Sequence, residues 1–202
     1  MTTIQEHDRQ VLCRRLADAA FAGVGIEVGV QSGRFSGQLL RSSQVKHLHL
    51  VDCWCTHENP DGSGSETQAD HDRHYKRAMA EVQKSRSRNQ EVSVHRGFTA
   101  DVLPGLPFGT FDWAYIDAMH TYDGCLADLE ATERLIRPGG LIAGHDYEQG
   151  TEWARRVQCG VVDAVADFLK NRPNWVLEAV YEDSFRNNSY VLAHRPPGEV
   201  EA

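Results

Sequence analysis

The sequence has 202 residues, 41% hydrophobic and 25% charged, which predicts one soluble globular domain with a sizeable core. Its formal net charge of −8 weighs against a nucleic-acid partner, because phosphate backbones bind basic surfaces. No apolar run approaches the roughly 18 residues of a membrane span, the N-terminus is polar, and the five cysteines are irregularly spaced, so we expect reduced thiols and a cytoplasmic protein with no membrane partner.

Predicted strands and helices alternate along the chain. Apolar spacing over residues 5–21 predicts a helix within an N-terminal segment, residues 1–21. Further strands are expected at 24–28, 47–53, 92–95, 111–117, 140–146, 175–181 and 189–194, and further helices at 34–42, 68–84, 121–136 and 160–171. Pro138-Gly139-Gly140 predicts a stop and a turn, and residues 58–67 predict a surface loop.

This order predicts an α/β fold in a single domain, residues 1–202. We expect a Rossmann-like, doubly wound and mostly parallel seven-stranded sheet. The two closing strands lack a helix between them and predict an antiparallel edge hairpin over residues 174–194. An exposed edge of this kind is a candidate surface for a homodimer.

A glycine turn follows the strand at 24–28. The segment E-V-G-V-Q-S-G places Glu27 before Gly29 and Gly33, whereas a G-x-G-x-x-G fingerprint would need glycine at Gln31 and Arg34. Glycines allow a sharp turn and close approach of a ligand to the backbone. A carboxylate before the turn is unfavourable beside a pyrophosphate and suits a positive amine or sulfonium. The alternative is a tight strand-to-helix turn with an acidic residue.

Asp52 ends the strand at 47–53, at the carboxyl edge where open α/β sheets bind ligands. An acidic residue about 20 positions past the first glycines can accept both ribose hydroxyls. The alternative is an aspartate that caps the next segment. Together with Glu27, Asp52 favours a nucleoside ligand.

These motifs resemble those of class I S-adenosylmethionine-dependent methyltransferases. E-V-G-V-Q-S-G resembles the first motif of that family, and V-D-C-W resembles its ribose-binding acidic motif. The segments F-D-W-A-Y-I-D-A-M-H-T-Y-D-G-C-L-A-D-L-E and L-I-R-P-G-G-L-I-A-G-H-D-Y are more specific. They resemble a small bacterial branch that includes macrolide-sugar O-methyltransferases and cephalosporin-hydroxylase-type proteins, with catechol O-methyltransferases more distant. The likeness covers residues 22–195.

The resemblance implies S-adenosylmethionine as cofactor and assigns its contacts residue by residue. The methionine and ribose parts would lie against Glu27, Gly29 and Gly33, and the ribose hydroxyls against Asp52. The adenine edge would lie against Gly97, Phe98 and Thr99, and the methyl group beside Asp117.

The resemblance also implies a reaction centre. In catechol-type relatives, aspartates at the positions of Asp117 and Asp146 bind Mg²⁺, with His145 where other relatives carry a further acidic ligand. His120 stands where the family often has a lysine base, and histidine can accept a proton at neutral pH. Tyr147 replaces the usual asparagine. The alternatives are a helix cap at Asp117, a surface loop at His120 and a plain turn at 145–146.

A second cluster is a candidate zinc site. Its residue types, cysteine and histidine, bind zinc, and its members are Cys53, Cys55, His57, His71 and His74. However, C-x-C is not a usual zinc spacing. We favour instead a lid formed by residues 54–84, whose histidines would face the substrate. The function expected is O-methylation of a small hydroxylated metabolite such as a sugar, a phenol or a natural-product intermediate. The alternatives are a cofactor-binding protein without catalysis, a non-methylating enzyme on the same scaffold, and a nicotinamide-dependent reductase.

Overall fold

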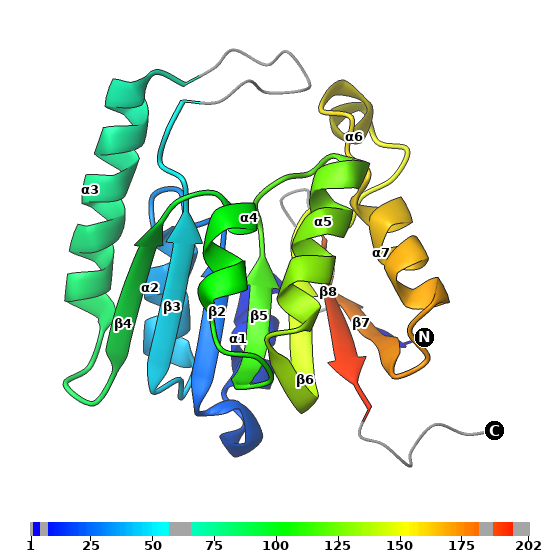
Figure 1. Cartoon of the computed structure of the whole chain (residues 1–202), viewed down its shortest axis with the longest axis horizontal. Helices are drawn as coiled ribbons and strands as arrows, with labels where there is room; N and C mark the ends of the chain where they lie inside the picture. The colour runs from blue at the N-terminus through cyan, green and yellow to red at the C-terminus, as the bar shows by residue number, and fades with distance from the viewer. Residues whose placement is uncertain (1, 5–7, 57–65, 182–187, 196–202) are drawn as a thin grey trace.

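The computed structural model describes residues 2–4, 8–56, 66–181 and 188–195, and these form a central sheet between two layers of helices (Figure 1). The described strands lie in the order β1-β7-β8-β6-β5-β2-β3-β4. Their bounds are β1 Thr2–Ile4, β2 Val24–Val28, β3 His47–Asp52, β4 Glu91–Arg96, β5 Phe111–Ile116, β6 Ile136–Gly144, β7 Trp175–Tyr181 and β8 Ser189–His194.

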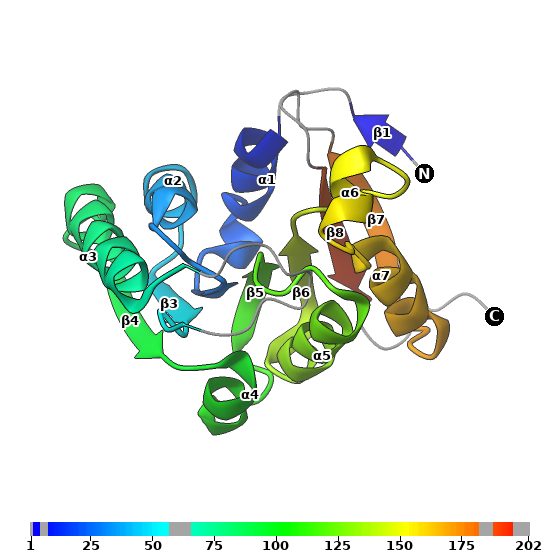
Figure 2. The same ribbon diagram turned by 90° about the horizontal axis from the view of Figure 1, so that it is seen from above.

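The helices cover both faces of the sheet (Figure 2). Their bounds are α1 Asp8–Leu16, α2 Arg34–Ser42, α3 Gln68–Ser85, α4 Thr99–Val102, α5 Tyr122–Glu133, α6 Glu152–Arg156 and α7 Val161–Lys170, with 3₁₀ turns at Ala19–Phe21 and Leu103–Gly105. One apolar core joins the sheet to α1, α2 and α3, and a second joins it to α5 and α7. The central strand β5 is buried along its whole length, as expected of a parallel strand covered on both faces.

The predicted α/β sheet and its antiparallel pair of closing strands are confirmed. Strands β2 to β6 pair in parallel, while β8 runs antiparallel to both β6 and β7. β1 adds an eighth strand, parallel to β7 and paired along Ala179–Tyr181. That stretch of the expected dimer edge is therefore already hydrogen-bonded within the chain, and the homodimer stays a prediction.

Four local features differ from expectation. The N-terminal helix covers Asp8–Leu16 rather than residues 5–21, with β1 before it, and the short helices α4 and α6 were not predicted. Pro138-Gly139-Gly140 lies inside β6, where the register with β5 shifts between Phe111 and Trp113. Such a bulge accommodates a proline because the displaced residue makes no ladder hydrogen bond. The loop expected at 58–67 lies largely outside the described residues.

No helix in the described part of the chain combines the length and the apolar character needed to cross a bilayer.

Candidate active site

The carboxyl edge of the sheet brings the predicted motifs into one row. Four backbone hydrogen bonds continue the strand ladder beyond the strand ends, with N···O distances between 2.8 and 3.1 Å: Gly97 to Asp52, Gly29 to Val51, Asp117 to Val28, and His145 to Ile116. Because these bonds join neighbouring strands, segments far apart in sequence lie side by side. This is the edge at which open α/β sheets bind ligands.

A cavity of about 500 Å³ opens at this edge, a size that suits a small-molecule ligand. Eight of the predicted residues line it, namely Glu27, Gly29, Asp52, Gly97, Phe98, Thr99, Asp117 and His120. Glu66, His71 and His74, at and just before the start of α3, line the same cavity. Most of the residues predicted for the cofactor and for the reaction therefore share one space, and Gly33, His145 and Asp146 are not among the residues that line it.

The two glycines of the turn have different surroundings. A Cβ on Gly29, whose φ is +88°, would lie 2.0 Å from the carbonyl oxygen of Asp117, so only glycine fits between β2 and β5 here. Gly33 adopts φ +73° at the start of α2, and a Cβ there would lie 2.7 Å from Cα of Ala78 in α3. Gly33 does not line the cavity. Gly33 therefore lies at a contact between α2 and α3, and its contact with the cofactor stays a prediction.

Glu27 is only 1% exposed and lines the cavity. Its carboxylate accepts a hydrogen bond from the hydroxyl of Ser36 on α2. A buried carboxylate needs such partners, because losing water is costly for a charged group. Sequence reasoning missed Ser36, although a serine on the apolar face of α2 is a detectable signal.

Asp52 joins two turns at the cavity wall. Its Oδ2 accepts from the backbone N–H groups of Val30 at 2.9 Å and Gln31 at 2.8 Å, and its Oδ1 accepts from that of Trp54 at 2.7 Å. The buried Trp54 indole in turn donates to the Gln31 carbonyl at 2.8 Å. Asp52 thus makes the capping contacts that were considered as an alternative, and it also lines the cavity. Trp54 was not predicted, because this contact depends on the folded turn.

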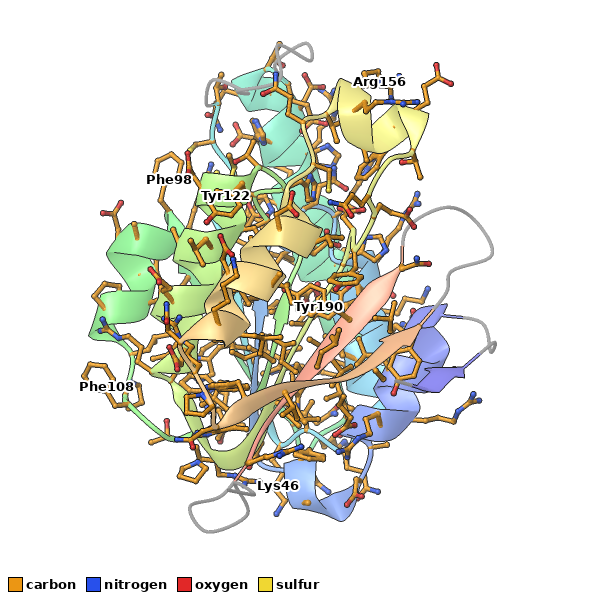
Figure 3. The ribbon with its side chains drawn as sticks, turned by 90° about the vertical axis from the view of Figure 1, so that its right-hand side faces the viewer. Lys46, Phe98, Phe108, Tyr122, Arg156 and Tyr190 are labelled. Carbon is orange, nitrogen blue, oxygen red and sulfur yellow. The ribbon has the colours of Figure 1, made fainter. Side chains whose placement is uncertain are left out.

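Phe98 presents an accessible aromatic ring at the cavity. It precedes α4 and is 49% exposed, whereas Tyr190 on β8 lies in the interior (Figure 3). An exposed ring in a binding cavity is suited to stack on a planar ligand group. Its contact with adenine stays a prediction.

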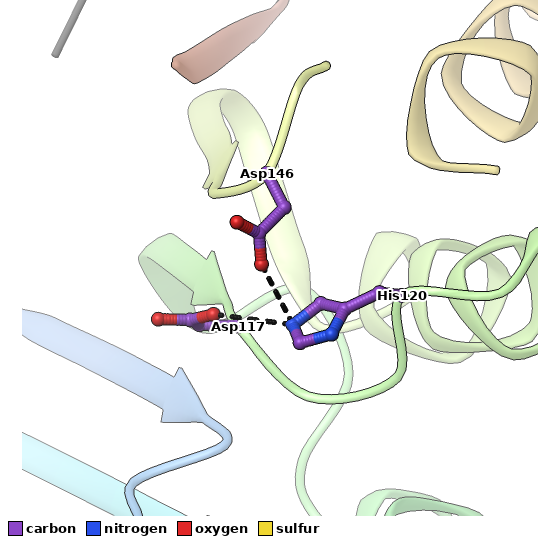
Figure 4. A group of neighbouring side chains, drawn as sticks. All are labelled: Asp117, His120 and Asp146. Atoms are coloured by element: carbon purple, nitrogen blue, oxygen red, sulfur yellow. Dashed lines mark ion pairs between the residues drawn. The ribbon is translucent and has the colours of Figure 1, made fainter. Parts of the chain in front are cut away.

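Asp117, His120 and Asp146 converge at the ends of β5 and β6 (Figure 4). Nε2 of His120 lies 2.8 Å from Oδ2 of Asp146 and 3.6 Å from Oδ1 of Asp117. Nδ1 of His145 lies 3.2 Å from Oδ1 of Asp146 and 3.8 Å from Oδ1 of Asp117. Asp146 is 3% exposed and adopts a left-handed φ of +57°, a conformation that marks a specialised site.

The charges of this cluster are strongly coupled. Burial disfavours the charged imidazolium of His120, but the carboxylates of Asp117 and Asp146 outweigh burial and raise the pKa of His120 to about 10. Burial likewise opposes the charge of Asp146, while His120 and His145 hold the pKa of its carboxyl group well below the usual range. At neutral pH the ligand-free cluster therefore contains an imidazolium, which is not a base.

The zinc alternative gains little support from the described residues. Burial raises the pKa of the Cys53 thiol to about 11, which disfavours the thiolate that zinc binds. His57 lies outside the described residues. His71 and His74 contact Glu66 instead, with Nε2 of His74 at 3.1 Å from its Oε1. Within the described ranges, Asp117, His120 and Asp146 are the one trio of metal-binding side chains whose donor atoms converge.

Comparisons with known proteins show the family and the fold. A family model described as a methyltransferase domain matches residues 26–147. No curated protein sequence matches the chain.

Solved structures share the fold at low sequence identity. Cofactor-bound Rv0187 from MTB is 19% identical, with a TM-score of 0.63 over 92% of this chain and 78% of that one. The N-methyltransferase NodS from Bradyrhizobium japonicum WM9 is 14% identical, with a TM-score of 0.63 over 93% and 94%. The O-methyltransferase from Bacillus cereus in complex with SAH is 17% identical, with a TM-score of 0.62 over 95% and 83%. At these identities the likeness shows the fold alone.

Proposed function

The chain belongs to the methyltransferase domain family whose model matches residues 26–147, and from that premise we propose that it transfers the methyl group of S-adenosylmethionine to a hydroxyl oxygen of a small metabolite. One observation carries the proposal: a single cavity contains both the residues suited to the cofactor and the Asp117–His120 reaction centre. Cofactor-bound relatives of the same fold support the choice of cofactor.

The cofactor half of the cavity suits the chemistry of S-adenosylmethionine. The buried carboxylate of Glu27 offers a negative partner for the amine or sulfonium at the glycine turn. Asp52 lies at the distance along the chain at which family members bind ribose, and the Phe98 ring is accessible to adenine. The cofactor half is also lined by Gly29, Gly97 and Thr99. Gly33 would act indirectly, by fixing the position of α2.

The acceptor half is polar. Glu66, His71 and His74 face the same cavity as Asp117 and His120. A wall of carboxylate and imidazole groups suits an acceptor with several hydroxyl groups, such as a sugar, a phenol or a natural-product intermediate. This placement supports the role proposed for residues 54–84 as a lid, and the chain's net charge of −8 supports a small acceptor over nucleic acid.

Methyl transfer requires alignment and removal of one proton. The sulfonium is already electrophilic, so the protein must hold the acceptor oxygen in line with the methyl group. His120 was predicted as the base, but its pKa of about 10 means that it carries a proton at neutral pH in the ligand-free cluster. A divalent cation held by Asp117, His120 and Asp146 would lower the pKa of a hydroxyl acceptor, so that the acceptor's proton could pass to water without a protein base.

The alternatives predict different outcomes. A cofactor-binding partner without catalysis would bind S-adenosylhomocysteine and transfer no methyl group to any hydroxylated acceptor. A non-methylating enzyme on this scaffold would alter its substrate without consuming S-adenosylmethionine. The absence of G-x-G-x-x-G at Gly29 weighs against a nicotinamide-dependent reductase.

Calorimetric titration with S-adenosylhomocysteine tests the cofactor, with NAD as control and with or without Mg²⁺. Micromolar binding of S-adenosylhomocysteine and none of NAD is expected. Methyl transfer from labelled S-adenosylmethionine to a panel of hydroxylated acceptors, lost in Asp117→Ala, then tests the reaction. Failure of S-adenosylhomocysteine to bind under any of these conditions contradicts the proposed function.

A further inference from the structure

The cluster at the ends of β5 and β6 offers both oxygen and nitrogen atoms as metal ligands. Two carboxylates, from Asp117 and Asp146, lie against two imidazoles, from His120 and His145. Two carboxylates completed by water would suffice for Mg²⁺, which binds oxygen ligands. The imidazole nitrogen of His120 between these carboxylates is the donor that suits Mg²⁺ poorly.

Nε2 of His120 is the atom on which the two carboxylates converge. This nitrogen is buried and lies 2.8 Å from Asp146, yet it makes no hydrogen bond of acceptable geometry within the described residues. One ligand atom each from Asp117, His120 and Asp146 lies within 4.8 Å of the other two. Figure 4 shows the carboxylates of Asp117 and Asp146 directed at the ring nitrogen of His120, with Asp117 and His120 on the loop between β5 and α5 and Asp146 just after β6. Two carboxylate oxygens and one imidazole nitrogen held this close form a ligand set for a divalent ion, which would take the place of the proton on His120.

We infer that Asp117, His120 and Asp146 form a binding site for a divalent transition-metal ion of the manganese-to-zinc series, in which His120 is a ligand and Mg²⁺ is disfavoured. Imidazole nitrogen is a good ligand for these ions and a poor one for Mg²⁺. His145, 3.2 Å from Asp146, orients that carboxylate from outside the ligand set. The ion's part in methyl transfer rests on the proposed function, but its binding does not.

Co²⁺ is the probe that tests this site, because its visible absorption reports the ligands directly. We expect metal-free protein to bind one Co²⁺, Zn²⁺ to displace it, and Mg²⁺ in hundredfold excess to leave the spectrum unchanged. His120→Ala should weaken Co²⁺ binding by at least tenfold. His120→Asp restores an oxygen donor and should narrow the preference for Co²⁺ over Mg²⁺ by at least tenfold.

His74→Ala is the matched control, since it removes a histidine that lines the same cavity but lies outside the cluster. It should bind Co²⁺ as the unmodified protein does. Equal Co²⁺ affinity in His120→Ala, or displacement of Co²⁺ by equimolar Mg²⁺, would overturn the inference. S-adenosylhomocysteine titrations of the same variants separate the two ideas: cofactor binding without a Co²⁺ site refutes only this inference, and a Co²⁺ site without cofactor binding refutes only the proposed function.

Discussion

The carboxylate of Asp52 holds the backbone of Gln31, with Oδ2 lying 2.8 Å from the amide nitrogen. The same oxygen accepts from Val30, and Oδ1 accepts from Trp54. One side chain therefore fixes the glycine turn and the start of the segment that we propose as a lid. A change at Asp52 should affect both stability and cofactor binding.

We predict that Asp52→Ala lowers the free energy of unfolding by roughly 2–3 kcal/mol, about 1 kcal/mol for each lost backbone hydrogen bond. S-adenosylhomocysteine affinity should fall at least tenfold, because the turn and the ribose contact are lost together. Urea unfolding and calorimetry measure the two effects. Asp101→Asn, an exposed carboxylate on α4, is the control and should change neither. Unchanged cofactor affinity in Asp52→Ala would remove Asp52 from the binding site.

Gly33 should tolerate alanine worse than Gly109 does, although both have positive φ. A Cβ at Gly109 meets nothing within 4 Å, so the substitution costs about 1 kcal/mol of left-handed strain. A Cβ at Gly33 also clashes with the backbone of α3 at Ala78, and the cost should rise to roughly 2–4 kcal/mol. Urea unfolding compares the two variants. Cofactor affinity of folded Gly33→Ala should stay within threefold, and a larger loss would return Gly33 to the cofactor site.

Without a metal ion, the cluster should make the free energy of unfolding depend on pH in the alkaline range. The pKa of His120 rises from 6.5 to about 10, so its ion pair is fully present below about pH 6.5 and is lost as the pH rises through about 10. His120 is 37% exposed, and solvent screening limits the effect to roughly 1 kcal/mol. Urea unfolding at pH 7 and pH 10 should show this loss, and His120→Asn should lack it. Identical pH dependence in the two proteins would disprove the pairing.

Replacing the carboxyl group of Asp128, on α5, by an amide should stabilise the folded protein. The side chain is 5% exposed, and burial raises the pKa of its carboxyl group to about 6. A carboxyl group whose pKa is higher in the folded protein stabilises the fold when it is protonated. The contribution of Asp128 to the free energy of unfolding is therefore fully present below about pH 4 and is lost as the pH rises through about 6. We predict that Asp128→Asn is more stable than the unmodified protein at pH 8 by about 1–2 kcal/mol, with no difference at pH 4. Urea unfolding of both proteins at pH 4 and pH 8 tests this prediction. A variant less stable than the unmodified protein at pH 8 would contradict it.

Elements whose apolar residues repeat locally could be predicted from the sequence. The helix expected at 34–42 is α2, because Phe35, Leu39 and Leu40 form one buried face. The strand expected at 24–28 is β2. In contrast, β1 is defined by its pairing with β7, more than 170 residues away in sequence, and α4 and α6 are too short to show a helical period.

Some features of the candidate site could likewise be predicted from the sequence, and others could not. The positions of Asp117 and Asp146 at the ends of neighbouring strands follow from the α/β pattern and the motifs. The contact of Nε2 of His120 with Asp146 depends on the path of the loop after β5, so neither its raised pKa nor its ligand geometry could be predicted. The Glu66 contacts of His71 and His74 were missed because the first turn of α3 sets them.

The shared cavity also has a kinetic consequence. Glu27 is 1% exposed, while the side chain of Glu66, which lines the same cavity, is 43% exposed. We expect a molecule bound against the more exposed Glu66 to hinder access to the buried Glu27, so that the ligand held by Glu27 enters first and leaves last. Steady-state kinetics should therefore be ordered, with the demethylated cofactor as the last product released and a competitive inhibitor against the methyl donor.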